Sequence, residues 1–165
     1  MLRSSPPQML LDTLELDGRV VADIGCGTGA IARAMAGAGA RVVGIDVKQS
    51  AIDAARAEPA VNGESFVLAA AEQMPFADGS QDLVVFHNSM HHVAVDGQAT
   101  AIAEAARVLV PGGAIEVSRA LRMPCSRISA LRSSSRSWMV GDARYFLASK
   151  SGNAPFSLAS STLAR

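Results

Sequence analysis

Short apolar runs alternate along the chain with longer stretches in which apolar residues recur every three or four positions. The runs predict buried strands at residues 19–24, 41–46, 65–69, 82–86 and 114–118. The longer stretches predict helices at residues 8–16, 28–38, 50–58 and 96–109. Strands without polar alternation are buried on both faces, so this order predicts an α/β protein with a doubly wound, mainly parallel sheet.

Single residues set several of the expected boundaries. Gly39 follows the second helix, where a helix C-terminus favours glycine. Ser50 is expected to cap the next helix, which should end before Pro59. The Pro-Gly-Gly sequence at residues 111–113 is expected to close the last helix and lead into the final strand.

The most informative stretch is residues 20–32, which read as a buried strand, a glycine turn and the start of a helix. Gly25 and Gly27 permit backbone angles that a Cβ would forbid, and they let a ligand approach the backbone. The unpaired N–H groups of the following helix favour an anionic or carboxylated group. Asp23, at the strand end, adds nothing to a pyrophosphate site, but it suits a ligand that carries an ammonium group.

The same turn also fits a dinucleotide-binding fingerprint. Residues 25–30 (GCGTGA) match G-x-G-x-x-A, and Asp46 lies about 20 residues beyond, where a ribose-binding acid belongs. A nicotinamide-dependent oxidoreductase therefore stays open as an alternative, and only Asp23 argues against it.

Five motifs in register then resemble class I S-adenosylmethionine-dependent methyltransferases, nearest in style to the small-molecule type that includes quinone-biosynthesis enzymes. The motifs lie within residues 20–118: DIGCGTG at 23–29, VGID at 43–46, AEQMPF at 71–76, DLVV at 82–85 with MHHV at 90–93, and EAARVLVPGG at 104–113. The resemblance implies a Rossmann-like sheet of strand order 3-2-1-4-5, with S-adenosylmethionine as cofactor and a small molecule as methyl acceptor.

The resemblance also implies the residues of the cofactor site. Asp23 would orient the amino group of the cofactor, the glycines would let its methionine part pass over the turn, and Asp46 would accept the ribose hydroxyls. In relatives an acid before the Ala-Glu pair contacts the adenine amino group, whereas this chain has Ala70 there. The expected cofactor-binding residues are Asp23, Gly25, Cys26, Gly27, Gly29, Asp46, Val47, Ala71, Glu72 and His87.

Candidate chemistry beyond the cofactor is sparse. His87, just past the fourth strand, is a weak candidate for the base that deprotonates an acceptor, and a satisfied loop histidine is the competing interpretation. His91 and His92 are expected to begin a helix, and their spacing predicts no metal site. The Cys26 side chain is expected to fill space rather than act as a nucleophile.

Composition divides the chain near residue 118. Residues 1–117 carry 7 Lys and Arg against 14 Asp and Glu, whereas residues 118–165 carry 8 basic residues, a single acid and 12 Ser. We therefore expect a methyltransferase domain at residues 1–118 and a disordered or non-native tail at residues 119–165, with the outer strands of the sheet missing or abnormal. A catalytically impaired nucleoside-binding module is the alternative that this ending leaves open.

The remaining expectations are general. No apolar run reaches about 18 residues, which predicts no membrane span. Two cysteines far apart in the sequence fit a reducing cytoplasm. The basic tail could touch nucleic acid, but the acidic core and the lack of a recognition motif make that partner unlikely.

Overall fold

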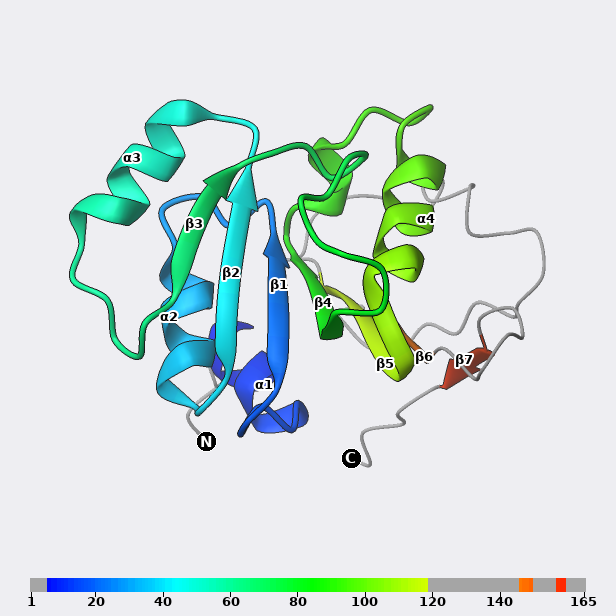
Figure 1. The fold of residues 1–165 in the computed structure, drawn as a ribbon, viewed down its shortest axis with the longest axis horizontal. Coiled ribbons are helices and arrows are strands. Elements are labelled where there is room, and N and C mark those ends of the chain that lie inside the picture. The colour runs from blue at the N-terminus through cyan, green and yellow to red at the C-terminus, as the bar shows by residue number, and fades with distance from the viewer. Residues whose placement is uncertain (1–5, 119–145, 150–156, 160–165) are drawn as a thin grey trace.

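The fold is a single seven-stranded sheet in the order β3-β2-β1-β4-β5-β6-β7 (Figure 1). The computed structural model describes residues 6–118, 146–149 and 157–159. The first five strands are parallel and β6 and β7 are antiparallel to their neighbours, which confirms the predicted α/β fold with strand order 3-2-1-4-5. The strands are β1 (Val20–Ile24), β2 (Arg41–Asp46), β3 (Ser65–Leu68), β4 (Gln81–His87), β5 (Leu109–Ser118), β6 (Phe146–Ser149) and β7 (Ser157–Ala159).

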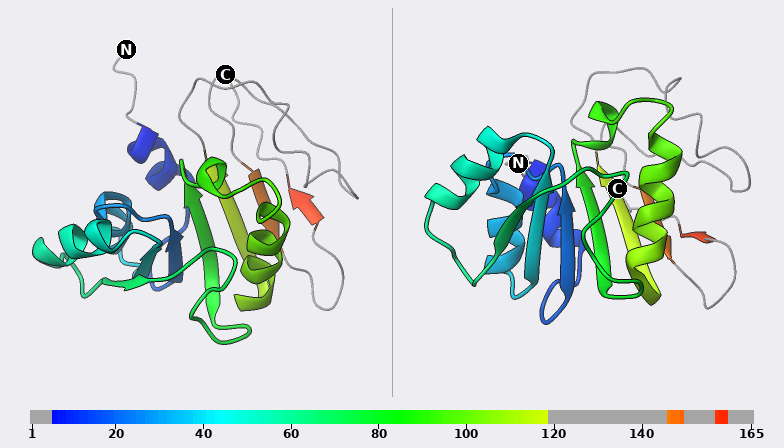
Figure 2. Two further views of the ribbon diagram at one scale, coloured as in Figure 1. Left: turned by 90° about the horizontal axis from the view of Figure 1, so that it is seen from above. Right: turned by 45° about the horizontal axis from the view of Figure 1, so that its top comes forward.

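Helices cover both faces of this sheet, and Figure 2 shows α1 and α4 on opposite sides of it. The helices are α1 (Pro6–Thr13), α2 (Ala30–Gly37), α3 (Gln49–Ala57) and α4 (Gln98–Val108), with a 3-10 turn η1 (Met90–His92) after β4. In the described part of the chain, no helix is long and apolar enough to cross a membrane.

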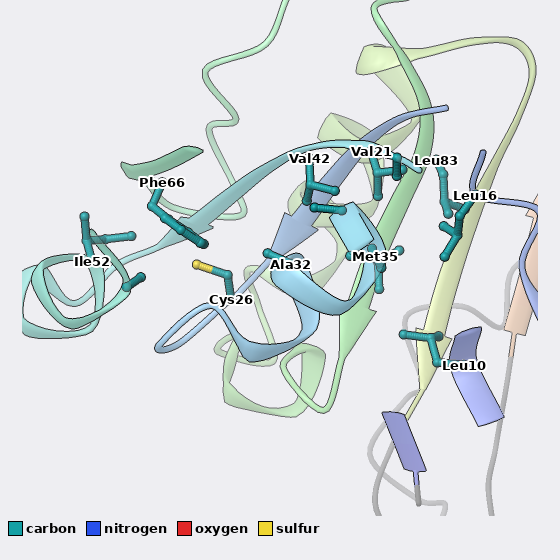
Figure 3. Packing of buried hydrophobic residues seen from close by; sticks show 14 residues of the cluster. Leu10, Leu16, Val21, Cys26, Ala32, Met35, Val42, Ile52, Phe66 and Leu83 are labelled. Atoms are coloured by element: carbon teal, nitrogen blue, oxygen red, sulfur yellow. The ribbon is translucent and has the colours of Figure 1, made fainter. Parts of the chain in front are cut away.

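The core consists of two clusters separated by the sheet, because successive residues of a strand point to opposite faces. Along β4, Leu83 and Val85 join the cluster that packs against α1, α2 and α3, whereas Val84 and Phe86 join the cluster under α4. Figure 3 shows the first cluster, in which the Cys26 side chain lies beside Phe66. Both faces of β4 are therefore buried, as its continuous apolar sequence predicts.

Two expected boundaries are wrong. The residue at the N-cap of α3 is Lys48, in extended conformation, so Ser50 lies inside the helix and does not cap it. The Pro-Gly-Gly sequence does not separate α4 from the last strand, because β5 already begins at Leu109 opposite Gln81. The Pro-Gly-Gly sequence is instead an irregularity within the strand. The pairing register of β4 with β5 shifts between Gln81 and Leu83, and Gly112 has a φ of +84°.

The outer strands of the sheet were expected to be missing or abnormal, and the structure shows that they are present beside β5. Residues 114–117 of β5 pair with β6, which in turn pairs with β7, so β5 has a neighbour on each side. This pairing satisfies backbone groups that an open edge would leave to solvent. The expected domain boundary at residue 118 and the nature of the tail lie mostly outside the described residues.

Candidate functional site

The registers of three strands bring their carboxyl ends together. Ile24 pairs with Ile45, which places the start of the glycine turn level with Asp46 at the end of β2. Asp23 pairs with Val85 on the other side, so Gly25 is level with His87 at the end of β4. In doubly wound sheets, ligands bind at the carboxyl ends of the strands where the strand order reverses, and β1 and β4 meet at that point here.

The glycine turn is fixed by its own backbone. The amides of Gly25 and Cys26 both donate to the carbonyl of Ile45, at 2.8 and 3.0 Å. Gly25, Gly27 and Gly29 all have positive φ, of 73°, 56° and 84°. A Cβ on Gly27 would meet no atom within 4 Å, whereas one on Gly25 or Gly29 would collide with a neighbouring side chain. The turn therefore has open space in front of Gly27 and close packing on both sides of it.

Asp46 connects the end of β2 to this turn. One carboxylate oxygen accepts a hydrogen bond from the amide of Gly27 at 3.0 Å, and the other accepts one from the amide of Lys48 at 2.9 Å. Asp46 remains partly exposed. A carboxylate held by two amides is preorganised, and it retains lone pairs for hydroxyl donors.

Asp23 is almost fully buried, at 1% exposure. Burial is the main cause that raises the pKa of its carboxyl to about 7; the hydrogen bond from the backbone amide of Ala32 opposes this rise, and the nearby charge of Asp46 adds to it. Among the described residues, its Oδ2 atom has no hydrogen-bond partner. A buried carboxylate oxygen without a partner costs free energy, which a cationic ligand would recover.

Sequence reasoning missed Ser89. It is 8% exposed and packs so closely on the glycine turn that a Cβ on Gly25 would lie 2.5 Å from the Ser89 Cβ atom. Its hydroxyl has no hydrogen-bond partner within the described part of the chain. The signal available in the sequence was its place just after β4, level with the glycine turn.

An ion pair between Arg33 and Glu64, which the sequence analysis did not predict, supports the glycine turn. The Arg33 guanidinium, from α2, donates to the Thr28 carbonyl at 2.8 Å and to the Ala55 carbonyl of α3. It lies 5.3 Å from the centre of the Phe66 ring and 3.7 Å from the buried carboxylate of Glu64. Through these contacts α2, α3 and β3 hold the last residues of the turn.

Glu64 keeps its charge in this cluster. Burial alone would raise the pKa of its carboxyl, but the amides of Asn62 and Val61 and the Arg33 guanidinium outweigh it and lower the pKa below its ordinary range. Both amides lie 3.0 Å from the carboxylate. The ion pair with Arg33 is therefore present at neutral pH.

The loop after β3 is fixed to α4. Arg107 donates to the carbonyls of Met74 and Phe76, at 3.1 and 2.9 Å, and it forms ion pairs at 2.7 Å with Asp78 and Glu104. Glu104 in turn accepts the amide of Met74 at 2.9 Å. The hydrogen bond from Arg107 lowers the pKa of the Glu104 carboxyl. The loop that carries Ala71 and Glu72 thus has defined anchors.

The other predicted site residues occupy different environments. Val47, next to Asp46, is 64% exposed, whereas Ala71 is buried in the core cluster under α4. The Glu72 carboxylate lies against Gly97, just before α4, where a Cβ on that glycine would meet its Oε1 atom at 2.6 Å. His87 is partly buried at the end of β4, and this burial lowers its pKa.

The Cys26 side chain belongs to the core. It points toward Phe66 (Figure 3), and a Cβ on Gly44 would lie 2.9 Å from its sulfur. Burial, followed by the charges of Asp23 and Asp46, raises the pKa of its thiol to about 12. A thiol protonated at neutral pH is a poor nucleophile, which agrees with the expected space-filling role.

Comparisons with known proteins agree with this geometry. Residues 22–117 match the family model described as a methyltransferase domain. A ubiquinone biosynthesis O-methyltransferase of Thiobacillus denitrificans is 40% identical over 101 residues, which cover 59% of this chain and 43% of that protein. The chain spans about half the length, or less, of the curated relatives it matches.

Solved structures show the same relationship. A protein of Bacillus subtilis, YcgJ, has a TM-score of 0.63 and 28% identity, covering 69% of this chain and 50% of that one. A SAM-dependent methyltransferase of Methanosarcina mazei has a TM-score of 0.60 and 29% identity, covering 71% and 58%. With the family model spanning most of the described core, the chain belongs to the methyltransferase domain family, of the class I S-adenosylmethionine-dependent type.

Proposed function

We propose that this chain binds S-adenosylmethionine at the carboxyl ends of β1, β2 and β4 and that it transfers the methyl group to a small-molecule acceptor. One arrangement carries the proposal: two strand-end acids, Asp23 and Asp46, flank a glycine turn that leaves open space at Gly27. A pyrophosphate-binding turn gains nothing from the buried carboxylate of Asp23, whereas a ligand with an ammonium group and ribose hydroxyls offers a donor to both Asp23 and Asp46.

The residues present fit such a cofactor. Asp23 takes the ammonium group, which satisfies its buried Oδ2 atom. Asp46 accepts the ribose hydroxyls with a carboxylate that two amides already orient. Val47, which is 64% exposed beside Asp46, offers an apolar surface to the base, and the methionine part lies over the turn at Gly27. When bound, the cofactor supplies an activated methyl group.

This chain contributes mainly alignment. Methyl transfer is an in-line displacement, and holding two reactants in the right geometry can supply roughly 7–11 kcal/mol of the barrier. The fixed turn, the braced α2 and the anchored loop after β3 all serve that rigidity. No covalent intermediate on the protein is required, so the buried thiol of Cys26 has no part in the step.

The acceptor is proposed from the relatives. Three of them carry the name ubiquinone biosynthesis O-methyltransferase, which makes an oxygen atom of a small molecule the first acceptor to test. An acceptor hydroxyl would lose its proton near the end of β4. His87 is proposed as the base, because the burial that lowers its pKa keeps the imidazole neutral and able to accept a proton.

Titration calorimetry on the full chain tests the proposal. S-adenosylmethionine and its demethylated product should both bind, and NAD should give no heat of binding. NAD is the informative control because the turn also fits the dinucleotide fingerprint. Binding of NAD without any response to S-adenosylmethionine would refute the proposal.

A further inference from the structure

We infer that Ser89 is a binding residue for the amino-acid end of the ligand, and that its hydroxyl and Asp23 together accept the ligand's ammonium group. This inference rests on the proposed function and adds a residue that neither the family motifs nor the comparisons assign. It starts from two buried polar atoms, Asp23 Oδ2 and Ser89 Oγ, which have no hydrogen-bond partner in the described part of the chain.

Both atoms belong to the same small region. Gly25 follows Asp23 by two residues, and the Ser89 side chain lies directly against it, with Oγ 3.2 Å from the place where a Gly25 Cβ would be. The missing side chain of Gly25 is therefore what lets Ser89 approach the turn. The hydroxyl therefore lies beside the glycine turn over which we place the methionine part of the cofactor.

The Ser89 hydroxyl does not cap the 3-10 turn that follows it. Serine at the start of a helix normally caps it with its hydroxyl, from an extended conformation. Ser89 stands at the N-cap of η1 in helical conformation, and its side chain makes no cap hydrogen bond. Its carbonyl already accepts the amide of His92 at 2.8 Å, so η1 begins without the hydroxyl.

The preceding residue turns the chain into this arrangement. Asn88 has a φ of +54°. In the described part of the chain, every other residue with a positive φ is a glycine. Non-glycine residues rarely adopt this conformation, and such residues cluster at functional sites. Because β4 ends level with Gly25, the turn at Asn88 brings Ser89 against the glycine turn.

An ammonium group matches the two atoms. It carries three N–H donors, whereas Asp23 Oδ2 and Ser89 Oγ are both able to accept. Leaving a buried polar atom without a partner is unfavourable, and most such atoms in folded proteins are paired. A single cationic group between them would satisfy both at once, which neither a neutral methylthio group nor a phosphate can do.

The test compares Ser89→Ala with Ser80→Ala, the same change at the residue just before β4. Calorimetry measures the binding of S-adenosylhomocysteine, of its analogue without the α-amino group, and of 5′-methylthioadenosine. Ser89→Ala should weaken the binding of S-adenosylhomocysteine about five- to tenfold and leave the affinities for the other two ligands unchanged. Ser80→Ala should change none of the three affinities, because its hydroxyl donates to the Ala77 carbonyl, away from the turn.

Thermal unfolding without ligand supplies the second measurement. Removing an unpartnered hydroxyl should leave the midpoint of Ser89→Ala unchanged or raise it, whereas a merely structural serine would lower it. Equal loss for all three ligands, no loss for S-adenosylhomocysteine, or a lowered midpoint would each overturn the inference. If the wild-type chain binds none of the adenosyl ligands, the proposed function fails first and this inference fails with it.

Discussion

The carboxylate of Asp46 accepts a hydrogen bond from the amide of Gly27 at 3.0 Å, so the end of β2 holds the middle of the glycine turn. The two residues belong to different sequence motifs, but they lie side by side in the structure because β1 and β2 pair in parallel register up to Ile24 and Ile45. The acid thereby has two roles. It orients the turn, and we propose that its remaining lone pairs accept the ribose hydroxyls of the cofactor.

Replacing Asp46 by alanine should weaken the binding of S-adenosylmethionine at least about tenfold, because a charge-assisted hydrogen bond contributes roughly 1.5–3 kcal/mol. Calorimetry on a variant that is shown to be folded measures the change. Asp53→Ala is the matched control, since its carboxylate lies on the exposed side of α3 and accepts a hydrogen bond from Gln49 of the same helix. An unchanged dissociation constant for Asp46→Ala would exclude the proposed ribose contact.

The glycines of the turn should respond differently to the same substitution. Gly27→Ala places a methyl group in open space, so it should cost about 1 kcal/mol of stability and abolish most ligand binding. Gly25→Ala adds a collision with the Ser89 Cβ atom at 2.5 Å, which should cost roughly 1–3 kcal/mol more. Chemical denaturation and calorimetry separate the two effects. A Gly27→Ala chain that binds as tightly as the wild type would show that no ligand passes over this residue.

Asp23 should make stability fall as the pH rises. Its pKa is raised from 3.8 to about 7 in the folded chain, so its contribution is fully present below pH 4 and is lost as the pH passes 7. Asp23→Asn should therefore gain stability relative to the wild type between pH 4 and pH 8, by up to roughly 4 kcal/mol. Denaturation midpoints across this range measure the difference, and parallel curves for the two chains would contradict it.

The same titration should appear in binding. The ammonium group of the ligand needs the ionised carboxylate, so the affinity of the wild type should rise as the pH increases from 5 to 7. Below pH 7, binding should release a proton, which calorimetry in buffers of different ionisation enthalpy detects. Asp23→Asn should lose both the pH dependence and the proton release.

Arg33→Met should destabilise the fold by roughly 2–3 kcal/mol, because it leaves the buried Glu64 carboxylate without its cation. It should also weaken cofactor binding, since the Thr28 carbonyl of the turn loses its donor. Arg41→Met is the control, because Arg41 is exposed at the start of β2 and its loss should change stability by less than about 0.5 kcal/mol. Equal unfolding midpoints for the two variants would argue against the bracing role.

Ala70→Asp should strengthen the binding of S-adenosylmethionine. Ala70 is partly exposed after β3, at the position where the resemblance to the family implies an acid for the adenine amino group, and the Glu72 carboxylate lies beside Gly97. A new carboxylate at this position would therefore supply an acceptor for the adenine amino group. Ala70→Asn should give a smaller gain. No gain in affinity for either variant would mean that another group already accepts a hydrogen bond from the adenine amino group.

The sequence alone determined the layers and the position of the glycine turn, and the resemblance of its motifs to the methyltransferase family implied the strand order 3-2-1-4-5. Hydrophobic periodicity needs no partner to be recognised, and positive φ restricts a turn to glycine wherever the chain folds. Asp23 and Asp46 could be chosen as site residues because each lies at the carboxyl end of a predicted strand and within a motif that resembles the family.

Local signals failed where a distant partner decided the conformation. Ser50 has the composition of a helix cap, yet α3 begins earlier, and the Pro-Gly-Gly sequence lies inside a strand because Gln81 pairs with Leu109 across the sheet. The strand that pairs with the outer edge of β5 is β6, at residues 146–149. No local sequence pattern predicts that these residues pair with β5.

Only the tertiary structure showed which polar groups are buried and which are satisfied. Ser89 looks in the sequence like any loop serine, and its importance arises from contact with Gly25, 64 residues earlier. The Arg33–Glu64 pair likewise joins residues from separate elements. Burial and pairing depend on the sum of contacts from several elements, whereas the sequence directly specifies only the local pattern within each one.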